Sequence, residues 1–167
     1  MHEVNQILLH SVVIGIGATL VMDAWGWIQK RVFHAPPLDY ALVARWLGHF
    51  SQGRFRHDSI MAATPVAGER AWGWIVHYAI GIVFAALPIA LWGLEWVRNP
   101  TLGPALIVGV GTVVVPFFIM QPAFGIGIAG TRTPKPGITQ IKSLAAHTSF
   151  AIGLFLAANA WAQLAWL

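Results

Sequence analysis

The chain has 167 residues, of which 57% are hydrophobic and only 10% are charged, with a formal net charge of +4. Soluble domains carry about 25% charged residues, so this composition excludes an ordinary water-soluble globular protein. The absence of cysteine excludes disulfides and thiolate metal sites. No recognition motif accompanies the positive charge, and we expect no nucleic-acid partner.

Four apolar segments each have about the 20 residues that a helix needs to cross a bilayer. They cover residues 7–28, 71–94, 102–124 and 144–167. Only helices and closed barrels satisfy every backbone group in lipid, and these segments lack the alternation of barrel strands. The sequence therefore predicts an all-α integral membrane protein, with one domain over residues 1–167.

Basic residues concentrate in two of the three loops between these segments. Six Lys or Arg residues lie between the first and second segments and three between the third and fourth, whereas the remaining loop has only Arg98. The positive-inside rule makes the two basic loops cytoplasmic and leaves both termini outside. We expect the basic loops to contact anionic lipid headgroups of the bilayer.

The first basic loop, about 30–70, contains a predicted short helix in YALVARWLGHF, residues 40–50. Pro36 and Pro37 end the first membrane helix, and Asp39 is a suitable N-cap. Apolar residues fall on one face of the short helix and Arg45 and His49 on the other, which is typical of an amphipathic helix at a membrane interface. Residues of this loop with anion- or ligand-binding side chains are Arg45, His49, Arg54, Arg56, His57 and Asp58.

The sequence groups the four segments as two helical hairpins of similar plan. GIGATLV, from Gly15, resembles GVGTVVV, from Gly109, in the first helix of each hairpin. The second helix of each contains a histidine followed by Ala-Ile-Gly, after His77 and after His147. An internal duplication and a chance match between apolar sequences both explain this pattern.

Each predicted span also has one polar residue at a similar depth near its cytoplasmic end. Asp23 lies about 7.5 Å and His77 about 9 Å inside the hydrocarbon boundary, at 1.5 Å per residue. His147 and Gln121 lie near the corresponding ends of the last two spans. Polar residues in membrane helices usually face the bundle and pair with one another, so we expect Asp23, His77, Gln121 and His147 to share a polar site. The competing interpretation is that each is an isolated hydrogen-bonded contact between helices.

Several longer stretches resemble a known family. LDYALVARWLGHFSQGRFRHDSI, GERAWGWIVHYAIGIVFA and PFFIMQPAFGIGIAGTRTP are similar to an uncharacterised family of small bacterial inner-membrane proteins, a domain of unknown function. The similarity extends from about Gly15 to Gly153. It implies four membrane helices and a multi-pass location in the bacterial inner membrane, and it assigns no activity.

Three classes of function fit these residues. Intramembrane Asp and His residues favour binding and translocation of a small solute or ion, with proton coupling through histidine. The first alternative is a redox or enzymatic protein holding a transition metal through His77, His147 and Asp23, or haem b between the two histidines. The second is a non-catalytic scaffold or partner subunit, and a homo-oligomer is compatible with all three.

Overall fold

The computed structural model describes residues 2–165, and it is helical throughout its regular secondary structure in that range. Four helical segments are long and apolar enough to cross a membrane: Glu3–Val32, Glu69–Arg98, Leu102–Ala123 and Pro136–Leu164. These segments confirm the four predicted spans. The last two residues of the fourth predicted span, 166–167, lie outside the described residues.

The helices extend beyond the predicted spans at several ends. Helix α1 covers His2–Val32, α3 covers Glu69–Arg98 and α6 covers Pro136–Ala165. Proline is favoured in the first turn of a helix because its missing N–H would have no partner there, so α6 begins at Pro136 and not near residue 144. Within α3, Gly93 has φ 73° and interrupts the helical backbone.

The third span is the least regular. Helix α4 covers Leu102–Gly111, a π-helical turn covers Pro116–Met120, and the short helix α5 covers Gln121–Ala123. Pro116 and Pro122 lack a backbone N–H, so an unbroken ladder of α-helical hydrogen bonds cannot run through this segment. The π turn is one of the local adjustments by which membrane helices accommodate proline.

The chain forms two compact units. Unit 1 contains Met1–Pro36, Tyr78–Thr112 and Ala145–Leu167, and unit 2 contains Pro37–His77 and Val113–Leu144. Unit 1 therefore holds α1, α4, most of α3 and most of α6. The division falls between His77 and Tyr78, which are neighbours on α3.

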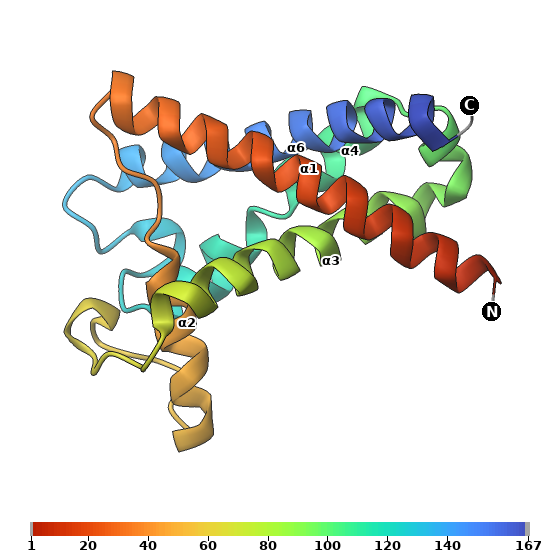
Figure 1. Cartoon of the computed structure of the whole chain (residues 1–167). Coiled ribbons are helices and arrows are strands. Elements are labelled where there is room, and N and C mark those ends of the chain that lie inside the picture. Colours follow the sequence, from red (N-terminus) through yellow and green to blue (C-terminus); the bar gives the residue numbers. More distant parts are fainter. Residues whose placement is uncertain (1, 166–167) are drawn as a thin grey trace. The chain divides into compact units, whose positions relative to one another are not determined.

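Helices of unit 1, α1, α3, α4 and α6 (Figure 1), approach one another closely at glycine residues. A Cβ added to Gly15 on α1 would lie 2.6 Å from the Cα of Ile82 on α3. One added to Gly153 on α6 would lie 2.8 Å from the Cα of Ala18 on α1. Small residues permit such backbone approach in lipid, where close packing contributes much of the helix association.

Unit 1 has an apolar core, with a few buried polar side chains beside it, and its outer faces carry many apolar side chains. Ile14, Ala85 and Leu154 belong to a core whose members are almost completely buried. Leucine, isoleucine and valine side chains on the outer faces are exposed, for example Leu8 at 59% and Leu91 at 66%. Large exposed apolar surfaces are unfavourable in water and favourable against acyl chains, which is consistent with the membrane-crossing length of the helices.

Unit 2 is built around α2, Tyr40–Gly48, which a 3-10 turn at His49–Gln52 extends. Asp39 is its N-cap, and the carboxylate accepts the Ala41 N–H at 3.0 Å. The predicted cap and helix are therefore confirmed. Two further 3-10 turns cover Ile60–Ala62 and Ile128–Gly130. A small apolar core joins α2 to the loop and to the end of the third span; its buried members are Val43, Ile60 and Phe124.

Candidate functional site

The first polar contact of unit 1 joins α1 to α3. The hydroxyl of Tyr78 donates to the Asp23 carboxylate at 3.0 Å, and both side chains are partly buried. Thr19, one turn before Asp23 on α1, contacts Gly81, and Gly81 lies one turn after Tyr78 on α3. The close approach of the two helices at Gly81 thus places Tyr78 within reach of the carboxylate.

The second polar contact of unit 1 joins α4 to α6 through His147. Its Nδ1 lies 3.0 Å from Thr112 Oγ1 and 3.3 Å from the carbonyl oxygen of Gly109. The Thr112 hydroxyl donates to the same carbonyl at 2.7 Å. Because a carbonyl oxygen can only accept, the hydrogen of the neutral imidazole belongs on Nδ1, and the Nε2 lone pair of His147 is left for another group.

These two contacts lie at similar levels of unit 1. Helices α1 and α6 run in opposite directions (Figure 1) and meet where Gly153 packs on Ala18. Asp23 lies about 7.5 Å beyond this contact along α1, and His147 lies about 9 Å from it along α6, on the same side. A carboxylate held by a tyrosine hydroxyl and an imidazole with a fixed tautomer therefore occur at one end of the same helical unit.

The other two predicted polar-site residues belong to unit 2. The His77 ring stacks on Tyr40, with centroids 3.7 Å apart and planes at 15°, and Trp74 meets it edge-on at 5.9 Å. Gln121 is 4% exposed, and its amide nitrogen donates to Ser143 Oγ at 3.2 Å. Each of these side chains thus has a partner inside its own unit. A single site that unites all four residues stays a prediction.

The predicted metal site can be compared with the arrangement of side chains in the described part of the chain. No group of three or more His, Asp or Glu side chains among residues 2–165 has a geometry that could hold a metal ion. The orientation of His147, with Nδ1–H on a backbone carbonyl, is one that metal-binding histidines share. A single imidazole does not make a metal centre, and the predicted metal and haem sites stay predictions.

Arg45 of α2 is engaged in internal hydrogen bonds. Its Nε and one terminal nitrogen bond both carboxylate oxygens of Glu69, at 2.9 and 2.6 Å. The other terminal nitrogen donates to the carbonyl oxygens of Ile60 and Ala63, each at 3.2 Å. The hydrogen bond to Glu69 raises the pKa of Arg45. This guanidinium ties the loop to α2, and the polar face of α2 is therefore turned toward protein at this position.

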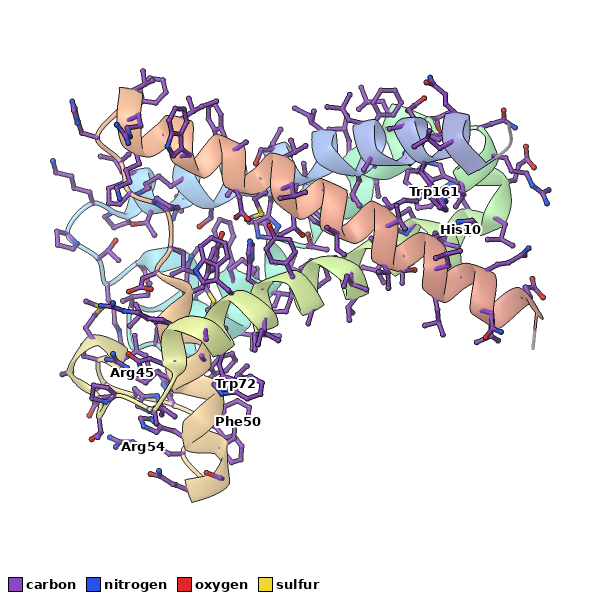
Figure 2. All side chains as sticks on the ribbon, in the orientation of Figure 1. His10, Arg45, Phe50, Arg54, Trp72 and Trp161 are labelled. Atoms are coloured by element: carbon purple, nitrogen blue, oxygen red, sulfur yellow. The ribbon has the colours of Figure 1, made fainter. Side chains whose placement is uncertain are left out.

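The remaining loop residues divide into a buried pair and an exposed set. His49 and His57 are 4% and 3% exposed, and His49 Nδ1 lies 2.8 Å from His57 Nε2. Arg54, Arg56 and Asp58 are exposed. Figure 2 marks Arg54 next to the turn that follows α2. Arg54 and Arg56 are therefore the exposed basic side chains of the predicted anion-binding set, with the acidic Asp58 exposed beside them.

Some polar partners were not predicted from the sequence. Tyr78 and Thr112 pair with predicted residues, and Trp161 donates its indole N–H to His10 Nδ1 at 2.7 Å at the other end of unit 1 (Figure 2). Tyr78 could have been predicted as a partner from its position. It lies one turn from Gly81, on the face of α3 that carries small residues. His10 and Trp161 are 151 residues apart, and no local pattern links them.

Comparison with known proteins identifies the family and goes no further. The chain belongs to the family described as protein of unknown function (DUF2938), whose sequence pattern matches residues 12–161. No curated protein matches the chain, and no solved structure does.

Proposed function

We propose that this protein binds a small solute or ion at the Asp23–His147 level of unit 1 and moves it across a bacterial inner membrane in a proton-linked cycle. The observation that carries the proposal is the Tyr78–Asp23 hydrogen bond of 3.0 Å between two apolar helices. Ionisable residues within membrane helices are unfavourable unless paired, and they commonly mark ion and proton pathways. We place both termini outside, following the basic loops.

His147 supports the proton-linked part of the proposal. Its Nδ1–H is held by Thr112 and Gly109, so protonation or ligand binding takes place at Nε2. Histidine changes charge near neutral pH, whereas a paired carboxylate can keep its charge or take up a proton as its surroundings change. Asp23 and His147 together supply an acid and a base, the two groups that a proton-coupled binding site needs.

The apolar layer beyond these residues limits the mechanism. Ile14, Ala18 and Leu154 are completely buried, and they separate the Asp23 end of unit 1 from the His10–Trp161 end. The Thr19 hydroxyl in this layer donates to the Gly15 carbonyl at 2.7 Å and offers no hydrogen to a passing ion. An open aqueous pore through unit 1 is therefore inconsistent with this packing, and movement of a solute requires the helices to separate.

Measuring the proton flux tests the proposal without knowledge of the solute. Proteoliposomes loaded with a pH-sensitive dye are given a potassium-diffusion potential, and internal acidification is followed. We expect a faster proton flux into liposomes that contain the wild type than into empty liposomes. In Asp23→Asn, the flux above that of empty liposomes should be at least about tenfold smaller. The control Asp39→Asn changes a carboxylate outside the predicted spans and should retain the flux. Equal fluxes for wild type, Asp23→Asn and His147→Gln would overturn the proposal.

A further inference from the structure

The buried histidine pair of unit 2 has a defined arrangement of protons. The Nε2 atom of His49 lies 3.1 Å from the carbonyl oxygen of Thr64. Because that oxygen can only accept, the hydrogen of neutral His49 belongs on Nε2, and its Nδ1 is an acceptor. The 2.8 Å contact between His49 Nδ1 and His57 Nε2 therefore requires the hydrogen on His57 Nε2.

This assignment leaves His57 Nδ1 without a proton in the neutral pair. The atom is completely buried and has no hydrogen-bond partner among the described residues. A buried acceptor without a donor has lost its hydrogen bond to water and gained none in return, which destabilises the closed arrangement. In these tautomers, His57 Nδ1 is the ring nitrogen of the pair whose lone pair accepts no hydrogen bond, so it can take up a proton without breaking one.

The same histidine fastens two segments of unit 2 together. Its backbone N–H donates to the Ala123 carbonyl at 2.8 Å, and the Ile60 N–H donates to the Phe124 carbonyl at 3.1 Å. On the other side of the segment, the Trp46 indole N–H donates to the Phe55 carbonyl at 2.8 Å. Residues 55–60 are thus held between α2 and the end of the third span, with the His57 ring buried in the contact.

The surroundings of His57 disfavour a positive charge. Burial lowers the pKa of His57, and the charges of Arg54 and His49 lower it further, while the Ala123 carbonyl and Asp58 act in the opposite direction. The charged or titratable side chains around the ring are His49, Arg54 and Asp58. The segments 60–64 and 121–125, which pack against it, contain no titratable side chain.

We propose that the His49–His57 pair is a proton-operated clasp, in which uptake of one proton at His57 Nδ1 releases residues 55–60 from Ala123 and Phe124. The proton comes from water, and the pair changes from neutral to singly positive with no other bond formed or broken covalently. A positively charged His57 ring that stays buried beside Arg54 has no water to solvate it. Opening of residues 55–60 exposes the ring to water, so protonation favours the open arrangement. The clasp does not depend on the proposed transport function.

Hydrogen exchange of the backbone amides reports the clasp directly. We measure the protection factors of the His57 and Ile60 amides in the detergent-solubilised full chain at about pH 7.5 and about pH 5, corrected for intrinsic exchange. We expect both to fall at least about tenfold at the lower pH, while amides in the middle of α1 keep their protection. Unchanged protection of His57 and Ile60 in the folded wild type would overturn the proposal.

Two variants identify the titrating group. His57→Gln keeps an amide donor for His49 but cannot take up a proton, and it should abolish the pH response. His34→Gln removes an exposed histidine and should retain it. Retention of the response in His57→Gln, or its loss in His34→Gln, would contradict the assignment.

Two charge changes test the same point without touching the buried pair. Arg54→Gln removes a positive charge that disfavours the enclosed imidazolium, so opening should require a lower pH. Asp58→Asn removes a negative charge that favours it, so opening should occur at a higher pH. Both residues are exposed, so these variants are expected to fold even where His57→Gln does not. The quantity compared is the pH at which protection of the His57 and Ile60 amides is half lost. Equal values for the two variants, or shifts in the opposite order, would overturn the proposal.

Discussion

Gly109 on α4 is a position where one added methyl group has a calculable effect. A Cβ there would lie 2.5 Å from the Cα and 2.8 Å from the N of Ala151 on α6, whereas ordinary Cβ contacts are 3.4–4 Å. The approached atoms belong to the backbone and cannot rotate away. Gly109→Ala therefore requires α4 and α6 to separate by about 1 Å at this level.

Gly111, two residues further along α4, provides the matched control. No atom lies within 4 Å of a Cβ added there, and its backbone is not in the left-handed region. Alanine gains about 0.5–1 kcal/mol over glycine in a helix at either position, and this gain largely cancels in the comparison. Overpacking costs about 1–3 kcal/mol, so we expect Gly109→Ala to be less stable than Gly111→Ala by that amount.

The assay is equilibrium unfolding in mixed micelles with increasing dodecyl sulfate, followed by the fluorescence of the nine tryptophans. The difference between the two variants in free energy of unfolding is the quantity to compare. Equal stability of Gly109→Ala and Gly111→Ala would refute the reasoning, because it would mean that the α4–α6 contact can open without cost.

Further predictions concern unit 2. Arg45→Lys loses the two-pronged contact with Glu69 and should lower the free energy of unfolding by about 1–2 kcal/mol, measured in the same micelle titration; an unchanged value would show that a single ammonium group suffices. Asp39→Ala removes the α2 cap and should cost about 1 kcal/mol, with Asp39→Asn as a nearly neutral control. Because burial lowers the pKa of His57, the unfolded chain binds its proton more readily than the folded one. Thermal stability should therefore fall as the pH drops from about 6.5 through the lower folded pKa. A melting temperature equally pH-dependent in His57→Gln would assign the effect to another group.

The membrane-crossing segments were predictable because length and hydropathy determine them. Each observed span overlaps its prediction, and the Asp39 cap was visible in the sequence from its position before an amphipathic stretch. The start of α6 at Pro136 was not predicted, since a Pro-Lys-Pro-Gly sequence also suits a turn. The interruption at Gly93 was not predicted either, because a glycine in an apolar run does not reveal its φ angle.

The polar contacts were only partly predictable. Depth along the spans singled out Asp23 and His147, and their hydrogen-bond partners Tyr78 and Thr112 depend on which helix faces meet. His77 and Tyr78 are adjacent in the sequence, yet the rotation of about 100° between them on a helix directs them to different neighbours. Position along a predicted span gives the depth of a side chain in the bilayer. It does not give the direction in which the side chain points around the helix axis.

The loop illustrates a second limit. The amphipathic pattern of α2 suggested a polar face toward the headgroups, but Arg45 and His49 bond to protein groups from the later part of the loop. Glu69 and Thr64, their partners, lie 24 and 15 residues further along the chain. Their pairing is a tertiary contact that helix periodicity does not contain.

The glycine contacts of unit 1 also have a consequence for energy conservation. A membrane protein that admits protons through a permanent gap would dissipate the gradient that drives its host's metabolism. Where Gly15, Gly109 and Gly153 bring backbones together, helices of unit 1 meet through main chain, which cannot swing aside like a side chain. Leakage is thereby tied to motion of whole helices, on the microsecond-to-millisecond timescale of such rearrangements.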